Sequence, residues 1–300
     1  MQVPGPFEYE RATGVDHAVA LLDRLGEEAR IVAGGHSLLP MMKLRLANPE
    51  YLIDINDLAA ELGYIVTDPT LVRIGAMVRH RHVLESDDLA TVCPIFRDAE
   101  RVIADPIVRN RGTIGGSLCQ ADPAEDLCTV CTVLGATCLV RGPSGDREIA
   151  MDDFLVGPYE PAMSHNELLI EIRIPVRHRT SSAYAKVARR VGDWAIAAAG
   201  ATVTLRGEAI AAARIGLTAV DPDPAALASS VDVLIGEPPT EKVFAEAGRR
   251  ASAACSPVSD ARGSADYKRH LASELTIRVL RTAVDRVLNH PAPEGNQPCR

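Results

Sequence analysis

Large aromatic side chains are scarce in this sequence: Phe, Trp and Tyr make up 4% of its 300 residues. Hydrophobic residues still make up 47%, so Ala, Val, Ile and Leu must fill the core. No apolar run reaches the ~20 residues that span a bilayer, and no basic segment followed by an apolar one begins the chain. We therefore expect no transmembrane segment and no signal peptide, and a chain of this length to form about two domains.

Positive charge and patterned cysteines are lacking too. The net charge of -8 disfavours nucleic-acid binding and gives no electrostatic reason to sit on an anionic membrane. The seven cysteines follow no regular spacing, which is typical of reduced thiols and not of a disulfide framework. We therefore expect a cytoplasmic protein.

The common nucleotide-binding signatures are absent as well. No Gly-x-Gly-x-x-Gly opens a helix after the first expected strand, and no Gly-x-x-x-x-Gly-Lys-Ser/Thr occurs. The sequence has instead two glycine pairs, Gly34-Gly35 and Gly115-Gly116, each followed closely by a serine, Ser37 or Ser117.

Each glycine pair suits close approach of the backbone to a ligand. Glycine turns sharply and has no Cβ in the way, and free N–H groups at such a turn cradle an anion. Two such segments from distant parts of the chain suggest a clamp around one phosphate-rich ligand. The alternative is that each pair merely marks a tight turn.

Hydrophobic periodicity and turn residues predict mixed helices and strands. We expect strands at residues 7–10, 29–33 (buried), 51–55, 71–75, 136–140, 168–174, 183–187, 195–205 and 210–220. We expect helices at residues 15–25, 93–102, 124–134, 240–254 and 265–288, with a helical turn near Pro40. Asp122 is the expected N-cap of the third helix, and residues 105–112 and 221–224 are expected to be loops. This order favours α/β layering followed by an α+β region.

The cysteine and histidine clusters admit two interpretations each. Cys128 and Cys131, flanked by Cys119 and Cys138, suit a redox pair or metal site, or the buried face of an apolar helix. The spacing matches no zinc or iron–sulfur pattern, so we adopt the second interpretation. His80 and His82 suit metal ligands, but no further ligand is nearby in the sequence. We interpret them as a solvated helix start.

Charged residues near the glycine motifs are also ambiguous. Among Asp122, Glu125 and Asp126, one carboxylate could accept hydrogen bonds from ribose hydroxyls, or all three could complement a helix dipole. The segment 186–194 carries Lys186 and the single Trp194. It could face a cofactor's negative charge and cover an aromatic ring, or be a strand with solvated charges.

Taken together, these motifs resemble the FAD-binding medium subunit of molybdenum hydroxylases, the carbon monoxide dehydrogenase and xanthine dehydrogenase family. The resemblance spans Phe7 to about residue 288. It rests mainly on Ala33-Gly-Gly-His-Ser-Leu-Leu-Pro-Met-Met-Lys-Leu-Arg-Leu46, Ile107-Val-Arg-Asn-Arg-Gly-Thr-Ile-Gly-Gly-Ser117, Ala121-Asp-Pro-Ala-Glu-Asp126 and Glu167-Leu-Leu-Ile-Glu-Ile-Arg-Ile-Pro175. Two departures are Ser117, where the family commonly has Asn, and Trp194, where Tyr or an aliphatic residue is usual.

The resemblance implies an α+β fold: a two-subdomain FAD-binding domain of the PCMH or vanillyl-alcohol-oxidase type, then a C-terminal α+β domain of the CO dehydrogenase flavoprotein type. We place the subdomains at 1–60 and 61–177, the C-terminal domain at 178–289 and a disordered tail at 290–300. The implied FAD-binding residues are Ala33, Gly34, Gly35, His36, Ser37, Leu38, Thr113, Ile114, Gly115, Gly116, Ser117, Asp126, Ile170 and Lys186. The two glycine stretches would hold the diphosphate through backbone N–H groups and hydroxyls. Leu168 to Ile170 and Lys186 would lie near the flavin ring.

The resemblance further implies an electron-transfer role without catalytic or metal-binding residues on this chain. A large molybdopterin-binding subunit and a small [2Fe–2S] subunit would be its partners, as a dimer of heterotrimers. FAD would receive electrons from the clusters and pass them to an external acceptor. The alternatives are a stand-alone FAD-dependent oxidoreductase of the same fold and a non-catalytic nucleotide-binding module. The substrate and acceptor stay open.

Overall fold

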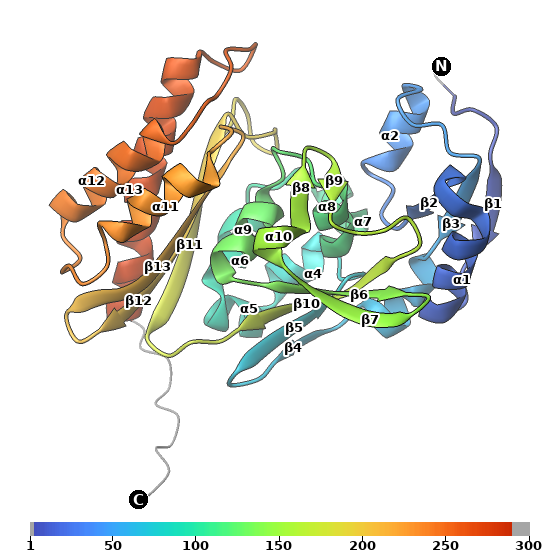
Figure 1. Cartoon of the computed structure of the whole chain (residues 1–300), viewed down its shortest axis with the longest axis horizontal. Coiled ribbons are helices and arrows are strands. Elements are labelled where there is room, and N and C mark those ends of the chain that lie inside the picture. Colours follow the sequence, from blue (N-terminus) through green and yellow to red (C-terminus); the bar gives the residue numbers. More distant parts are fainter. Residues whose placement is uncertain (1–2, 290–300) are drawn as a thin grey trace, which may run out of the picture.

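Three main sheets, each with its own helices, follow one another across the molecule (Figure 1). The computed structural model describes residues 3–289, so the predicted tail at 290–300 lies outside the described residues. Each sheet packs on a hydrophobic core of its own. The domain boundaries after residues 60 and 177 stay predictions.

The N-terminal sheet is parallel, with the strand order β1-β3-β2. Its strands are β1 (Glu8–Arg11), β2 (Ala29–Val32) and β3 (Tyr51–Asp54). Helix α1 (Val15–Leu25) crosses between β1 and β2 and buries one apolar face, as the periodicity predicts. The short helices are η1 (Gly26–Glu28), α2 (Leu38–Lys43), η2 (Asn56–Leu58) and α3 (Ala59–Leu62). The prediction that β2 is buried holds for Ala29 and Val32 but not for the whole strand, because β2 is an edge strand with Arg30 exposed.

The middle sheet is antiparallel, with the order β4-β5-β10-β6-β7. Its strands are β4 (Ile65–Thr67), β5 (Leu71–Gly75), β6 (Thr137–Gly142), β7 (Gly145–Ala150) and β10 (Leu168–Pro175). The helices of this unit are α4 (His80–Glu85), α5 (Asp87–Val92), α6 (Pro94–Glu100), α7 (Pro106–Arg111), α8 (Ile114–Gln120), α9 (Asp126–Leu134) and α10 (Met151–Phe154). A small hairpin pairs β8 (Leu155–Gly157) with β9 (Glu160–Pro161). Central β10 is buried along most of its length because helices and sheet neighbours cover it.

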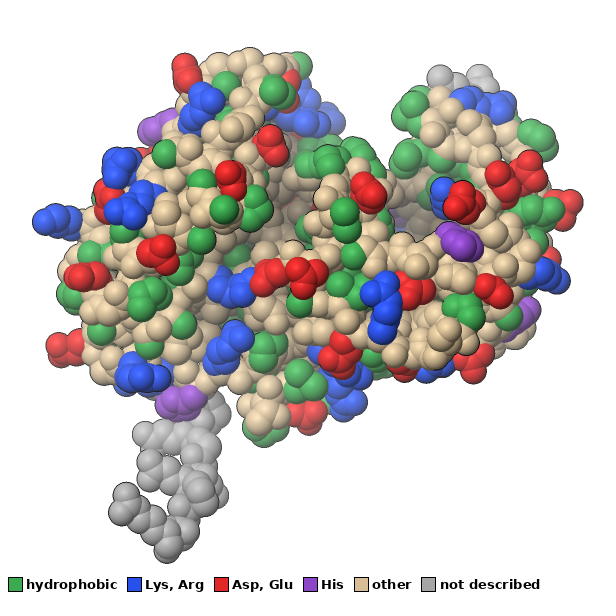
Figure 2. Space-filling view, viewed as in Figure 1, with side chains coloured by type: hydrophobic (Ala, Val, Ile, Leu, Met, Phe, Trp, Pro, Cys, Tyr) green, Lys and Arg blue, Asp and Glu red, His purple; other side chains and the backbone are tan. Residues whose placement is uncertain are grey.

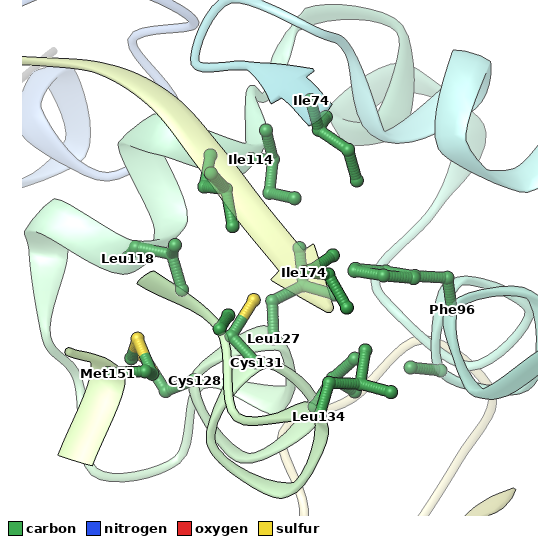
Figure 3. Packing of buried hydrophobic residues seen from close by; sticks show 14 of the residues in the cluster. Ile74, Phe96, Ile114, Leu118, Leu127, Cys128, Cys131, Leu134, Met151 and Ile174 are labelled. Carbon is green, nitrogen blue, oxygen red and sulfur yellow. The ribbon is translucent and has the colours of Figure 1, made fainter. Parts of the chain in front are cut away.

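The core between the middle sheet and its helices is aliphatic, with few aromatic rings (Figure 3). Phe96 is fully buried there, in the same cluster as Ile74, Leu134 and Ile174. Cys128 and Cys131 lie in this core on α9, which confirms that they belong to the apolar helix face. Free cysteine therefore packs here as a small hydrophobic residue.

Two local predictions in the middle unit were wrong because of capping. Residues 106–111 form α7 and not a loop, since the Asp105 carboxylate accepts the Val108 N–H at 2.9 Å and Pro106 begins the first turn. Helix α9 begins at Asp126, with Glu125 as its N-cap. Asp122 instead accepts the Ala124 N–H two residues on, which forms a separate turn before the helix.

The C-terminal sheet has the antiparallel order β11-β12-β13. Its elements are β11 (Thr180–Val187), β12 (Ala197–Arg206), β13 (Ala209–Thr218), α11 (Pro224–Asp232), α12 (Glu241–Ala253) and α13 (Ala265–Asn289). Helix α11 was missed, although Asp223 caps it and Pro224 stands at its first position. Helix α13 packs on β11 and β12, and α9 of the middle unit also packs against this sheet.

Glycine permits that second contact. A Cβ on Gly216 would come 2.9 Å from the Thr129 side chain of α9, and one on Gly200 would come 3.3 Å from the same atom. The Thr129 hydroxyl also lies 2.7 Å from that of Thr218. The C-terminal sheet is therefore fixed against α9, the helix that begins at Asp126.

A bidentate ion pair also ties the last helix to the middle unit. Arg286 of α13 donates to both oxygens of Asp98 on α6, at 2.7 and 2.9 Å, and the Ser182 carbonyl accepts a further bond from it. Both side chains are mostly buried. Charged bidentate pairs in such places stabilise more than exposed ones.

We expect Arg286→Ala to lower the free energy of unfolding by about 1–3 kcal/mol, because Asp98 then loses its partner while staying mostly buried. The control is Arg281→Ala on the same helix, whose pair with Glu241 is exposed, so its loss should change the free energy of unfolding far less. Urea denaturation measures both. An equal loss of unfolding free energy in the two variants would show that the contact between Arg286 and Asp98 does not tie the units together.

Candidate functional site

A single cavity of about 550 Å³ collects residues from all three units. Figure 2 shows the surface hollowed beside the lobe that carries α2. Of the predicted binding residues, those that line the cavity are Ala33, Gly34, Gly35, His36, Ser37, Leu38, Thr113, Gly115, Gly116, Ser117, Asp126 and Lys186. The volume lies within the range of cofactor pockets. The prediction that both glycine motifs face one site is thus supported by their position.

The first glycine motif joins β2 to α2 and presents free backbone donors. Gly35 has φ +77°, a conformation that favours glycine. Within residues 3–289, the N–H groups of Gly34, Gly35, His36 and Ser37 donate to no backbone acceptor, and α2 has no side-chain cap. Successive unpaired N–H groups form a cradle for an anion.

The second glycine motif differs from this expectation. Its glycines lie in the first turn of α8, and the N–H groups of residues 114–117 already have acceptors, that of Ser117 being the Thr113 carbonyl at 3.0 Å. Ile114 donates to the Val78 carbonyl at 3.0 Å, Gly115 to the Ala76 carbonyl at 3.0 Å, and Gly116 to the Thr113 hydroxyl at 3.1 Å. The expected cradle of free N–H groups is therefore found at the first motif only. At the second, Thr113 and Ser117, which both carry hydroxyls, line the cavity.

The two motifs touch each other directly. A Cβ on Gly34 would lie 2.4 Å from the Arg111 carbonyl oxygen and 2.7 Å from the Gly112 Cα. Arg79 strengthens this junction, since its guanidinium donates to the Asn56 side chain and to the Arg111 carbonyl. Glycine at residue 34 is therefore required for the N-terminal and middle units to meet.

Ile114 and Ile170 do not line the cavity. Ile114 is fully buried in the middle core, and Ile170 packs in the core of the N-terminal unit. The neighbours of Ile170 on β10, Leu168 and Leu169, do line the cavity, as does Trp194, which is 42% exposed. These side chains form an apolar wall, which suits one face of a ring system.

A buried ionic network connects the cavity to the C-terminal sheet. The Asp126 carboxylate on α9 accepts from Lys186 Nζ at 2.7 Å and from the Tyr184 hydroxyl at 2.5 Å, both on β11. The Asp126 and Lys186 side chains are 5% and 3% exposed. Burial raises the pKa of Asp126, while Lys186 opposes that rise. Of the segment 186–194, Lys186 thus points inward, whereas Arg189 and Arg190 are exposed beside Asp193.

A second buried network was missed from the sequence. His80 is 3% exposed, so its interpretation as part of a solvated helix start was wrong, although His82 is exposed as expected. His80 lies 2.9 Å from a Glu100 oxygen and 3.1 Å from the Ser117 hydroxyl. Only the fold brings Glu100 of α6 and Ser117 of α8 to the two sides of this ring, so no local signal could reveal it.

Glu125 adds a further carboxylate to the cavity wall. Burial and the neighbouring Asp126 raise the pKa of Glu125 to about 7. Asp122, by contrast, accepts from the Tyr159 hydroxyl at 3.0 Å and does not line the cavity. Of the three carboxylates considered for ribose, Glu125 is therefore the one whose side chain has the fewest protein partners.

Four cysteines of the middle unit, Cys93, Cys128, Cys131 and Cys138, are buried, whereas Cys119 is half-buried and lines the cavity. Burial raises the pKa of the Cys93 and Cys138 thiols to about 12 and that of Cys128 and Cys131 well above the usual range. Across residues 3–289, no group of three or more His, Cys, Asp or Glu side chains is arranged to hold a metal ion. In the same stretch no helix is long and apolar enough to cross a membrane.

A cavity clamped by two glycine motifs, with an apolar wall and a buried lysine, is typical of a flavin-binding domain. The family model described as the FAD binding domain in molybdopterin dehydrogenase matches residues 5–177, and the CO dehydrogenase flavoprotein C-terminal domain matches residues 182–283. The chain therefore belongs to the FAD-binding medium subunits of molybdenum hydroxylases, and its cofactor is FAD.

Individual relatives cover nearly the whole chain. The carbon monoxide dehydrogenase medium chain of Afipia carboxidovorans is 41% identical over 96% of this chain and 100% of its own. The glyceraldehyde dehydrogenase medium chain of Sulfolobus acidocaldarius is 35% identical over 93% and 98%. A solved carbon monoxide dehydrogenase from Hydrogenophaga pseudoflava, which lacks the Mo-pyranopterin moiety of its cofactor, matches with TM-score 0.89 and 39% identity over 95% and 99%.

The residues that line the cavity suit FAD chemically. Free N–H groups of the first motif suit a diphosphate, and the close glycine contact leaves no room for a side chain where that motif meets the second. The apolar wall suits the ring. The predicted contacts of individual residues with FAD stay proposals.

We expect Gly34→Ala to weaken FAD binding by at least tenfold, because its methyl group must push the Arg111 carbonyl away and separate the two motifs. The control is Gly14→Ala, since a Cβ there meets nothing within 4 Å. Fluorescence titration with FAD measures both affinities. Unchanged affinity in Gly34→Ala would contradict the clamp.

We expect Lys186→Met to lower the free energy of unfolding by about 3–5 kcal/mol, because it leaves the buried Asp126 carboxylate unpaired. Asp126 would then bind its proton more tightly in the folded state than in the unfolded one. The loss should therefore be smallest at acid pH and grow as the pH rises through the folded-state pKa. Thermal unfolding across pH measures this.

The matched control is the double variant Lys186→Met with Asp126→Asn. Because the amide carries no charge, the double variant should be more stable than Lys186→Met alone at neutral pH. A double variant that is less stable than the single one would show that the ion pair is not the relevant contact.

Proposed function

We propose that this chain is the electron-transfer subunit of a molybdenum hydroxylase. It receives electrons from [2Fe–2S] clusters of a small partner subunit and passes them through its FAD to an external acceptor. A large molybdopterin-binding subunit carries out the hydroxylation, and the assembly is a dimer of heterotrimers. We place it in the cytoplasm, where its thiols stay reduced.

The observation that carries this proposal is the cavity shared by the three units. Its walls combine the anion cradle of the first motif, the hydroxyls of Thr113 and Ser117, and the apolar surface of Leu168, Leu169 and Trp194. We assign the diphosphate to the first two and the flavin ring to the third. Bound there, FAD supplies the redox chemistry, while the protein holds and tunes it.

Access to the ring from outside supports electron exchange with a partner. Trp194 lines the cavity and is 42% exposed, and Val191 on the same loop is 96% exposed. This loop therefore separates the proposed ring position from solvent and is itself exposed. A redox partner that docks over exposed apolar side chains there comes close to the flavin.

The names of the relatives support placing the substrate site on another chain. The medium chains of carbon monoxide dehydrogenase and glyceraldehyde dehydrogenase are both similar to this chain over nearly its full length. Two substrates as unlike as these are compatible with one FAD subunit if neither substrate enters it. We therefore assign substrate choice to the large subunit.

Rapid mixing of the FAD-loaded chain with the prereduced [2Fe–2S] subunit, without oxygen, tests the proposal. We expect the flavin absorbance to bleach only when that subunit is present, and the isolated chain to turn over none of the family's substrates. Turnover by the isolated chain would favour the stand-alone oxidoreductase. Failure to bind FAD at all would favour the nucleotide-binding module.

A further inference from the structure

Glu100, His80 and Ser117 form a chain of hydrogen-bonding groups that runs from the core to the cavity. Glu100 of α6 is fully buried, and its Oε1 lies 2.9 Å from His80 Nδ1. His80 Nε2 lies 3.1 Å from Ser117 Oγ, and Ser117 lines the cavity. Both ring nitrogens thus have partners, and only the far end of the chain reaches the cofactor site.

The imidazole ring has little freedom to turn away from these partners. A Cβ on Gly112 would come 2.7 Å from His80 Cδ2, so glycine is needed for the ring to fit where it lies. The His80 backbone N–H donates to the Gly112 carbonyl at 3.2 Å, which fixes the start of α4 against the second glycine motif. The ring is therefore part of the wall that supports this motif.

The proton count decides which way the Ser117 hydroxyl points. When His80 and Glu100 share two protons, Nε2 carries a hydrogen and donates to Ser117 Oγ. This holds whether the second proton sits on Nδ1 or on the carboxyl group. Because Ser117 then accepts from His80, its own O–H is free to donate into the cavity. When the pair loses one proton, Nδ1–H donates to the carboxylate and Nε2 becomes an acceptor for the Ser117 O–H.

The surroundings favour the protonated pair. Glu100, Glu125 and Asp126 face His80 from α6 and α9, and Arg109 of α7 lies near Glu100. Lys186 is paired with Asp126 and so offsets part of that negative charge. Burial lowers the pKa of His80, but the Glu100 carboxylate outweighs it, so the net direction is upward.

We propose that His80, held by Glu100, is a positioning residue that keeps the Ser117 hydroxyl pointed at the diphosphate of FAD as a hydrogen-bond donor. FAD affinity then depends on the proton that His80 and Glu100 share. The inference rests on the proposed position of the diphosphate. It gives the Ser117 hydroxyl a role that the backbone of the second motif cannot take, since the N–H groups of residues 114–117 are already bonded.

The test is the FAD dissociation constant of the full chain, measured from about pH 6 to about pH 9 in the wild type and two Ser117 variants. In the wild type it should rise about tenfold as the pair loses its proton, because one hydrogen bond to a charged oxygen is lost. The midpoint should lie above the ~6.5 of an ordinary imidazole.

The two variants distinguish hydrogen-bond donation by the side chain of residue 117 from a purely structural role of that residue. Ser117→Ala should bind FAD about tenfold more weakly than the wild type at neutral pH, with no such transition. Ser117→Asn has an amide that donates whatever the state of His80, so it should bind tightly with a flat profile. A wild-type profile without a transition, or an equal transition in Ser117→Asn, would overturn the proposal.

Two further variants on α4 complete the experiment. His80→Gln should lose the pH transition. His82→Asn changes an exposed histidine two residues further along the same helix and should keep the transition. If His80→Gln does not fold, the comparison of Ser117→Ala with Ser117→Asn still tests the proposal. A flavin midpoint potential that shifts in Ser117→Ala while FAD affinity stays constant would place the hydroxyl at the ring and overturn the proposal.

The outcome is independent of the electron-transfer role. A flat pH profile together with bleaching of the flavin by the reduced partner would reject the role of His80 and leave the proposed function intact. A pH transition in FAD affinity without bleaching of the flavin would support the role of His80 and reject the proposed electron transfer.

Discussion

The close contact between Gly34 and the Arg111–Gly112 backbone is the constraint on which the cofactor site depends. It brings a loop of the N-terminal parallel sheet against a helix start of the middle unit, with no side chain between them. The junction brings the free N–H groups of the first motif and residues Thr113 and Ser117 of the second into one cavity lining. The site is a product of packing between units and belongs to neither alone.

Two buried carboxylates hold further parts of the site in place. Asp126 holds Lys186 and Tyr184, and so ties the cavity wall to the C-terminal sheet. Glu100 holds His80 behind the second glycine motif. Buried carboxylates cost solvation free energy unless paired, so each fixes its partners firmly. Rigid positions of this kind suit a protein that holds a redox cofactor without taking part in bond making.

Local signals in the sequence predicted the elements well where one face is apolar, as in α1, or where turn residues end a strand, as in the expected strand at 136–140 that became β6. The pairing of the two glycine motifs in one site could also be predicted, because their composition suits the same ligand. Predictions failed where a residue distant in the sequence determines hydrogen bonding or burial. The N–H groups of α8 are taken by Ala76 and Val78, and His80 is buried by Glu100, contacts that no spacing reveals.

The pair between Asp98 and Arg286 joins residues 188 positions apart. During synthesis the two glycine motifs leave the ribosome early, but β11 and the loop with Trp194 follow much later, and α13 last. A nascent chain that ends before β11 therefore has an open half-site, with Asp126 lacking its lysine and the cavity lacking Trp194 and its neighbours. Cofactor loading thus belongs after translation, when the last helix has closed on α6.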